Sequence, residues 1–314
     1  MTSSEIQLSI VIPAFNSSKS LPHVVAKLYQ QSCVSSVRIE VVLVNDSSPD
    51  QTWHVIKQLS EKYPNLLGIN LSRNYGQHAA TICGCIHTSG NWVATIDDDL
   101  EQDPESIFLM YQEAHLQEPD VFYGDLINRT HGISRNISSN IARAIFSLAI
   151  PGLYYNYSSL RLIRGQIARE LGRFDGPFPF IDGYLAWLTN KFDSIQVPHN
   201  SRHDGISNYS KRKLISHALG IFSIFSNYPL RIASNLGLLF SMIGFSGLSV
   251  ILLSKLLGFN YLPGYASIMA SMLMVGGLQL LVLGIIGEYI AKINYKTSKR
   301  PLYNIRQTTE RSEL

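Results

Sequence analysis

Charge is scarce in this chain of 314 residues. Asp, Glu, Lys and Arg make up 16% of the sequence, whereas ordinary soluble domains contain about 25%. The 26 basic and 23 acidic residues leave a net charge of +3. This balance excludes a strongly basic nucleic-acid binder and a long acidic disordered tail. We therefore expect a folded protein with no nucleic-acid partner, in which particular segments lack charge.

Cysteine is scarce as well. The three cysteines, Cys33, Cys83 and Cys85, are odd in number and form no C-x-x-C pair, which argues against a disulfide framework and against a zinc site. We expect buried or half-buried thiols in a reducing compartment. Residues 1–8 lack a basic stretch followed by an apolar one. The sequence therefore predicts no signal peptide and a cytoplasmic N-terminal part.

The missing charge is concentrated near the C-terminus. No Asp, Glu, Lys or Arg occurs from Ile232 to Ser254 or from Leu256 to Gly287, and about 20 apolar residues span a membrane as a helix. Turn residues separate the two stretches, so we predict a transmembrane hairpin of residues 232–254 and 266–290. Lys and Arg residues flank the hairpin on both sides, which places both flanks in the cytoplasm. The alternative is a buried helical hairpin of a soluble domain.

Two shorter segments border the predicted hairpin. Residues 211–231 begin with the basic triplet Lys-Arg-Lys and continue as an apolar stretch with interspersed polar residues. This pattern suits a juxtamembrane helix at anionic headgroups, or equally the last helix of the soluble domain. Residues 291–314 are expected to form a cytoplasmic tail. Gly276 and Gly277 could allow close approach of another helix, as in a homo-oligomer.

Residues 1–210 alternate short apolar runs with helical patterns, which predicts an α/β domain on a mainly parallel sheet. The expected strands are residues 8–12, 39–44, 66–71 and 92–96, the first stopping at Pro13. Ser48 is the expected cap of one helix, and Asp103 marks the start of another. The motifs G-x-G-x-x-G, G-K-S/T, H-E-x-x-H and G-x-S-x-G are absent. Polar residues gather instead beyond the strand ends, where open α/β sheets bind ligands.

The strongest chemical signal is the acidic run Asp97-Asp98-Asp99, followed by Glu101. Adjacent carboxylates repel one another, whereas hard divalent cations favour carboxylate oxygens and keep positions open for phosphates. In an extended segment Asp97 and Asp99 face the same way and Asp98 turns aside. The alternative is an acidic turn that caps the next helix.

Four segments at the strand ends together resemble the inverting family 2 glycosyltransferases of GT-A fold. They are residues 10–16 (IVIPAFN), 44–50 (VNDSSPD), 73–78 (RNYGQH) and the acidic run. The segment 199–209 (HNSRHDGISNY), the two spans, and residues 287–290 (GEYI) and 299–303 (KRPLY) resemble the polyprenyl-phosphate branch of that family. This branch includes dolichol-phosphate mannose synthase and bacterial undecaprenyl-phosphate sugar transferases with a C-terminal membrane hairpin.

The resemblance implies a site for a UDP- or GDP-linked sugar. Asp46 would contact the nucleoside, with Phe15 and Asn16 on the same wall. Glu101 occupies a position where the family commonly has Gln. The implied donor-binding residues are Pro13, Phe15, Asn16, Asp46, Gln77, Asp97 and Asp98, and the implied ligands of Mg²⁺ or Mn²⁺ are Asp97, Asp99 and Glu101.

The resemblance also implies an acceptor site for a lipid phosphate. Arg202 is the first candidate for binding this phosphate and is counted with Asp99 and Asp182 as catalytic. Asp182 could be a general base or only an orienting group, with Asp125 a second candidate base. The remaining acceptor candidates are Arg129, Arg135, Arg161, Ser207 and Tyr209, while Arg143, His78 and His203 are weaker candidates.

The predicted function is transfer of one sugar, with inversion, from a nucleotide sugar to a polyprenyl (undecaprenyl) phosphate. The enzyme would be an integral protein of the bacterial inner membrane, with its catalytic domain and C-terminus in the cytoplasm. One alternative is a membrane glycosyltransferase that acts on a saccharide acceptor or in polysaccharide synthesis, although the chain lacks a Gln-x-x-Arg-Trp segment. Another is a non-catalytic lipid carrier.

Overall fold

The computed structural model describes residues 6–126, 150–174, 179–198, 235–240, 264–297 and 301–309, with isolated positions between 242 and 257. The chain divides into two compact units. The first consists of Met1–His217 and Arg300–Leu314, and the second of Ala218–Lys299.

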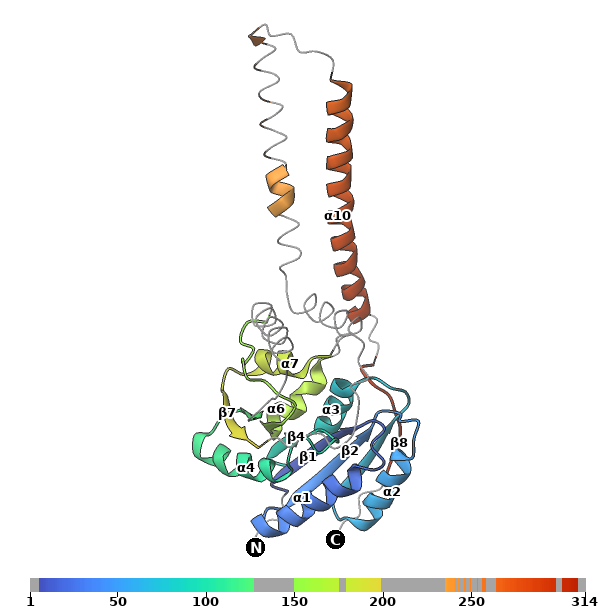
Figure 1. Cartoon of the computed structure of the whole chain (residues 1–314), viewed down its shortest axis with the longest axis vertical. Helices are drawn as coiled ribbons and strands as arrows, with labels where there is room; N and C mark the ends of the chain where they lie inside the picture. The colour runs from blue at the N-terminus through green and yellow to red at the C-terminus, as the bar shows by residue number, and fades with distance from the viewer. Residues whose placement is uncertain are drawn as a thin grey trace. The chain divides into compact units, whose positions relative to one another are not determined.

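An eight-stranded sheet forms the centre of the first unit, in the order β7-β5-β6-β4-β1-β2-β3-β8 (Figure 1). The pairs β1–β2, β1–β4, β2–β3 and β5–β7 are parallel, whereas β4–β6, β5–β6 and β3–β8 are antiparallel. The strands are β1 (Leu8–Ala14), β2 (Ile39–Asn45), β3 (Leu66–Leu71), β4 (Trp92–Thr95), β5 (Val121–Leu126), β6 (Arg161–Arg164), β7 (Phe192–Val197) and β8 (Ile305–Thr308). The predicted mainly parallel α/β sheet is confirmed.

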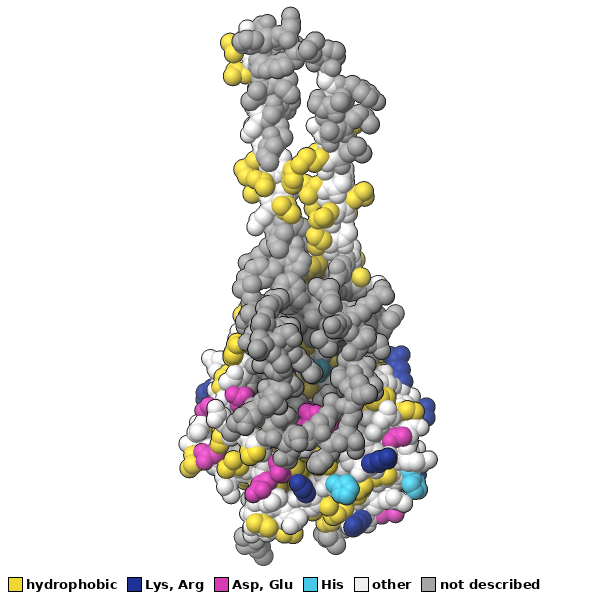
Figure 2. Space-filling view, viewed as in Figure 1, with side chains coloured by type: hydrophobic (Ala, Val, Ile, Leu, Met, Phe, Trp, Pro, Cys, Tyr) yellow, Lys and Arg dark blue, Asp and Glu magenta, His cyan; other side chains and the backbone are white. Residues whose placement is uncertain are grey.

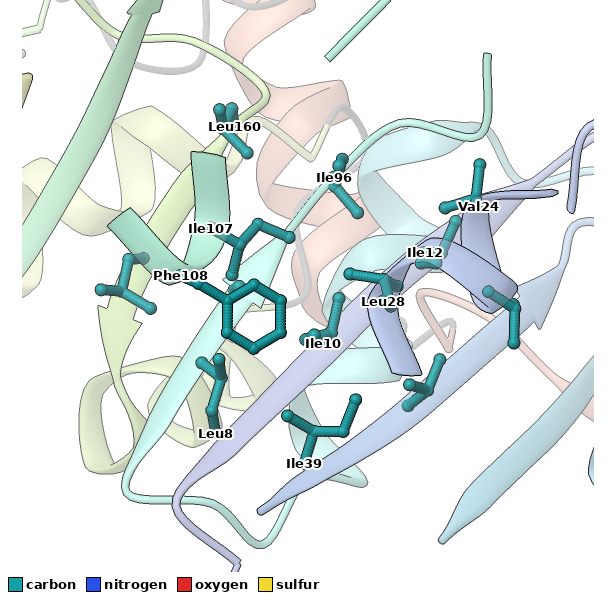
Figure 3. Close-up of a cluster of buried hydrophobic side chains, with 14 of the residues drawn as sticks. Leu8, Ile10, Ile12, Val24, Leu28, Ile39, Ile96, Ile107, Phe108 and Leu160 are labelled. Carbon is teal, nitrogen blue, oxygen red and sulfur yellow. The ribbon is translucent and has the colours of Figure 1, made fainter. Parts of the chain in front are cut away.

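Helices cover both faces of this sheet. Alternate residues of β1, such as Leu8, Ile10 and Ile12, pack with side chains of α1 and α4 in one core cluster (Figure 3). On the other face α3 lies against β1 and β2, where a Cβ at Gly84 would collide with Val11. The helices of this unit are α1 (Leu21–Ser35), α2 (Thr52–Lys62), α3 (Gln77–Ile86), α4 (Glu105–Gln117), α6 (Gly165–Glu170), the 3₁₀ helix η1 (Leu171–Arg173) and α7 (Ile181–Leu188).

The first strand continues through Pro13 to Ala14, so the expected stop at Pro13 is wrong. The carbonyl of Val11 accepts the N–H of Ile96, directly after β4, and that of Ala14 accepts the N–H of Asp46, directly after β2. Pro13 therefore faces the β4 side, where the pairing already ends at Val11 opposite Thr95. No ladder hydrogen bond is lost, which makes proline tolerable here.

The two helix starts predicted from capping residues differ in outcome. The Asp103 carboxylate accepts the Glu105 N–H at the start of α4, as the sequence predicts. Helix α2 begins only at Thr52, whose N–H and hydroxyl both bind the Asp50 carboxylate. The Ser48 hydroxyl instead donates to Asn45 at 2.6 Å, so Ser48 as a cap is wrong. Asp50 lies closer than Ser48 to the first free N–H groups of α2. Its carboxylate can accept hydrogen bonds from these groups.

The segment after residue 300 returns to the sheet. Strand β8 (Ile305–Thr308) pairs antiparallel with β3, and Ile69 lies opposite Thr308. The expected tail therefore contributes an edge strand to the first unit.

The second unit contains α10 (Tyr265–Thr297). Within the described residues, its stretch Met274–Ala291 is the one helical segment long and apolar enough to cross a membrane, by length and composition only. In Figure 2, described side chains of this unit include many hydrophobic ones, whereas charged side chains are visible on the first unit. The first predicted span, residues 232–254, lies mostly outside the described residues.

The three cysteines differ in burial. Cys83 and Cys85 are buried within α3, whereas Cys33 is exposed, so the expectation of a buried or half-buried Cys33 is wrong. Burial raises the pKa of both Cys83 and Cys85 to about 12, which leaves almost no thiolate at neutral pH. We expect iodoacetamide at pH 7.5 to modify Cys33 alone in the folded protein and all three thiols after denaturation, as measured by peptide mass spectrometry. Rapid modification of Cys83 in the folded protein would contradict this burial.

Candidate active site

The candidate site lies beyond the carboxyl ends of β1, β2 and β4, which are neighbouring parallel strands. Each of the three turns there contains a left-handed residue: Asn16, Ser47 and Leu100 have φ values of 59°, 55° and 62°. A bulky residue such as Leu100 rarely adopts this conformation. Such strain persists only where the surroundings impose it, and it concentrates at functional sites.

Asp46 follows β2 and is buried. Its two carboxylate oxygens accept the N–H groups of Tyr75 and Gly76 at 2.7 and 2.8 Å. Burial raises the pKa of Asp46, and the two N–H groups oppose that rise. Gly76 has a φ of +91°, which glycine adopts readily. Asp46 thus determines the course of the loop between β3 and α3, in addition to any contact with a nucleoside.

The turns after β1 and β4 are joined by Asp98. Its carboxylate accepts the Phe15 N–H at 3.1 Å and the hydroxyl of Ser17. Burial raises the pKa of Asp98, while Ser17 and Phe15 lower it. Asp98 thus binds the turn after β1, whereas Asp97 binds Gln77, Gln102 and Ser159. This division agrees with the predicted alternation. Phe15 is 46% exposed, which leaves this aromatic residue accessible for stacking on a planar ligand.

Asp97 lies in a polar network at the end of β4. One oxygen accepts the Gln77 amide at 2.6 Å, and the other accepts the Ser159 hydroxyl at 2.6 Å and the Gln102 amide at 3.2 Å. Burial, the largest cause, and the charges of Asp99 and Asp98 together raise the pKa of Asp97 to about 6, although the bond from Ser159 and the charge of Arg161 lower it. A cation would relieve this repulsion, so the residues present fit a divalent metal ion.

The protein side chains alone do not enclose such an ion. In the described part of the chain, no three Asp, Glu, His or Cys side chains converge as a ready metal cage. Asp99 accepts the Glu101 N–H at 3.1 Å, and both side chains are half-buried. A cation held beside Asp97 and Asp99 would therefore need further oxygen ligands, as the phosphates of a substrate provide.

Arg161 and Asp182 form a buried ion pair. The Arg161 Nε donates to Asp182 Oδ1 at 2.7 Å and its Nη2 donates to Oδ2 at 2.8 Å, while Tyr123 donates to the same carboxylate at 3.0 Å. Burial lowers the pKa of Arg161, but Asp182 outweighs it and the net shift is upward.

The same guanidinium reaches the Asp97 network. Its Nη1 lies 3.3 Å from the Thr95 hydroxyl and 3.2 Å from the Ser159 carbonyl. Arg161 therefore has protein partners at all three guanidinium nitrogens, and the acceptor-phosphate role that the resemblance implies stays a prediction. Through Ser159, the ion pair with Asp182 supports the position of Asp97.

The remaining predicted site residues lie in several parts of the structure. Gln77 binds Asp97, Asp125 lies on β5, and the His78 ring stands edge-on to Phe180 with centroids 5.6 Å apart. Pro13 is buried within β1. Several acceptor candidates lie outside the described residues: Arg129, Arg135, Arg143, Arg202, His203, Ser207 and Tyr209.

Sequence reasoning missed Ser17, Gln102 and Ser159, all of which bind an aspartate of the acidic run. Gln102 directly follows the run and could have been suspected as its amide partner. Ser17 and Ser159 carry no signal, because each is one of two adjacent serines in the sequence, and serines are common in polar stretches.

Comparison with known proteins shows which family the chain belongs to. Residues 9–171, which include β2 to β6 and all but the first residue of β1, match the model of glycosyl transferase family 2. The chain is 31% identical over 308 residues to a glycosyltransferase of Synechocystis sp., covering 95% of this chain and 94% of that relative. It is 28% identical over 303 residues to the bactoprenol glucosyl transferase of Shigella phage SfX, covering 96% and 99%.

A solved structure shows the same kind of fold. Glucosyl-3-phosphoglycerate synthase from Mycobacterium tuberculosis, in complex with phosphoglyceric acid, superposes with a TM-score of 0.50 at 15% identity, covering 70% of this chain and 78% of that chain. At this identity the likeness concerns the fold alone, and it agrees with the predicted GT-A type. By its sequence match over more than half its length, the chain belongs to glycosyl transferase family 2.

Proposed function

We propose that this protein transfers one sugar, with inversion, from a UDP- or GDP-linked donor to a polyprenyl phosphate. One observation carries the proposal: the buried Asp46 and the half-buried Asp97 follow β2 and β4, the two neighbours of β1, at the carboxyl edge of the sheet, in a chain that aligns over 96% of its length with a bactoprenol glucosyl transferase. Open α/β sheets bind nucleotides at this edge, and the relative's name supplies the class of acceptor.

Asp97 and Asp99 would hold Mg²⁺ or Mn²⁺, with Glu101 close enough in sequence to contribute a further oxygen. When bound, the metal would neutralise the charge that develops on the departing nucleoside diphosphate. The charged neighbours of Asp97 and its raised pKa support this assignment. Gln77, Gln102 and Ser159 orient the Asp97 carboxylate, so that the ligand is positioned before the donor arrives.

The donor's base would lie against Phe15, Asn16 and Asp46. Phe15 presents a partly exposed ring, and Asp46 holds the facing loop through Tyr75 and Gly76. In the reaction, an oxygen of the lipid phosphate bonds to the anomeric carbon while the bond from that carbon to the diphosphate breaks. A phosphate monoester loses its second proton near pH 6, so the nucleophile needs no protein base.

Asp182 then acts as a positioning residue. Its carboxylate is bound by Arg161 and Tyr123, and Arg161 contacts the segment that binds Asp97. The acceptor phosphate would be held by Arg202, assisted by Arg129, Arg135, Ser207 and Tyr209. Arginine suits this role because its planar group binds phosphate through two parallel N–H bonds.

The membrane would bring the acceptor to the enzyme. The apolar stretch of α10 supports one transmembrane helix, and the uncharged segment 232–254 supplies the other. We place the hairpin in the bacterial inner membrane, with the catalytic domain and C-terminus in the cytoplasm. Holding the site near the headgroups raises the effective concentration of lipid phosphate.

Product analysis tests the proposal. Membranes containing the full chain are incubated with undecaprenyl phosphate and a panel of radiolabelled UDP- and GDP-sugars, with Mg²⁺ or Mn²⁺. We expect one donor to yield a lipid that carries a single sugar on its phosphate, identified by thin-layer chromatography and mass spectrometry. A long polymer, a glycosylated saccharide or no new product with any donor would contradict it.

A further inference from the structure

The segment after α10 contacts the backbone of Ser72, at the start of the loop 72–76 that joins β3 to α3. The Ser72 N–H donates to the Asn304 carbonyl at 2.8 Å, and Arg306 Nη2 donates to the Ser72 carbonyl at 3.4 Å. Both backbone polar groups of Ser72 are therefore bound by residues that lie more than 230 positions later. We call Tyr303, Asn304 and Arg306 the C-terminal brace.

Ser72 lies three residues before Tyr75, which binds Asp46 together with Gly76. The hydroxyls of Ser72 and Tyr75 are 3.1 Å apart, and the Arg73 guanidinium lies over the Tyr75 ring at 4.7 Å. The N–H groups of Tyr75 and Gly76 then bind the Asp46 carboxylate. A displacement of Ser72 would consequently move the two donors that orient Asp46.

The brace also contacts α3. The Tyr303 hydroxyl is hydrogen-bonded to Cys83, which lies in the middle of this helix. The first residue of α3 is Gln77, whose amide binds Asp97 at 2.6 Å. The brace thus contacts the loop 72–76, which binds Asp46, and the helix α3, which binds Asp97.

We propose that the C-terminal brace is a positioning element of the nucleotide site: it holds the loop 72–76 and α3 so that Asp46 and Asp97 are oriented for the donor. This inference rests on the proposed function for the identity of the ligand. It assigns to residues that follow the membrane helix a role in donor affinity, although they lie outside the matched region 9–171.

Amide hydrogen exchange tests the geometry without any assumption about the reaction. In the full chain, the Tyr303→Phe/Arg306→Ala variant should exchange at Tyr75 and Gly76 about fivefold faster than the wild type, the effect of losing about one net hydrogen bond. Tyr303→Phe alone should increase exchange at the same two amides by less than the double variant does. Gln307→Ala, an exposed side chain of the same strand, should leave exchange unchanged. Wild-type exchange at both amides in the double variant would overturn the brace.

Nucleotide titration tests the consequence. With UDP or GDP and Mg²⁺ as probes, the double variant should bind about fivefold more weakly and raise the donor KM, with kcat and the acceptor KM almost unchanged. In an Asp46→Asn background the same change should weaken binding less than it does in the wild type, because the part of the effect that passes through the loop 72–76 is already lost. Additive losses, or a loss confined to kcat, would overturn the inference. Faster exchange in a protein that forms no sugar lipid would refute the proposed function and leave the brace intact.

Discussion

Sugar transfer by an Asp99→Asn variant is expected to fall about 100-fold or more, the scale of losing one preorganised electrostatic contact in an active site. Asn has the same shape as Asp, and its carbonyl can still accept the Glu101 N–H that Asp99 binds at 3.1 Å. The variant should therefore fold normally. It lacks the negative charge that would hold a cation against the donor diphosphate. Initial rates at saturating Mg²⁺ or Mn²⁺ measure the loss.

Glu105→Gln is the matched control, because Glu105 is an exposed carboxylate in the first turn of α4. It should transfer sugar at the wild-type rate. EDTA should stop transfer by the wild type, and added Mg²⁺ or Mn²⁺ should restore it. Wild-type turnover by Asp99→Asn, or full turnover in EDTA, would contradict the assignment of Asp99 to the metal.

An Asp182→Ala variant is expected to lose about 3–5 kcal/mol of stability, because it leaves the Arg161 charge buried without its partner. The two side chains are only 2% and 6% exposed, so water cannot replace the lost carboxylate. The loss corresponds to a fall in Tm of about 6–20 °C for a unit of this size. Thermal unfolding of the purified protein, followed by circular dichroism, measures it.

The double variant Arg161→Met/Asp182→Leu provides the control. Replacing both charges of a buried pair with apolar side chains is often neutral or stabilising, so most of the lost Tm should return. A general base would behave differently: Asp182→Asn would then unfold at the wild-type temperature and lose its turnover. That outcome would identify Asp182 as the base and contradict its anchoring role.

The pattern of the sequence was sufficient for the first half of the sheet. The runs that form β1 to β4 are short, apolar and bounded by turn residues, and burial on both faces leaves them few alternatives to a strand. The acidic run was recognisable because three adjacent carboxylates after an apolar strand are costly without a partner. Their position at the edge of the sheet follows from the parallel topology, in which strand ends meet.

Partners that are distant in the chain were not predictable in this way. Ser159 binds Asp97, and Arg161 binds Asp182, across separations of 62 and 21 residues. No local pattern encodes such contacts, because each residue type also suits an ordinary solvated surface.

The sequence by itself determined the α/β class, the family resemblance, the uncharged C-terminal stretches and the acidic run that defines the candidate site. These features depend on local composition and on spacing along the chain. Only the tertiary structure decided that Asp46 holds a loop, that Asp182 is paired with Arg161, and that β8 closes the sheet edge beside β3. Those outcomes depend on which segments meet in space, and that is set by packing and by the pairing of buried polar groups over the whole domain.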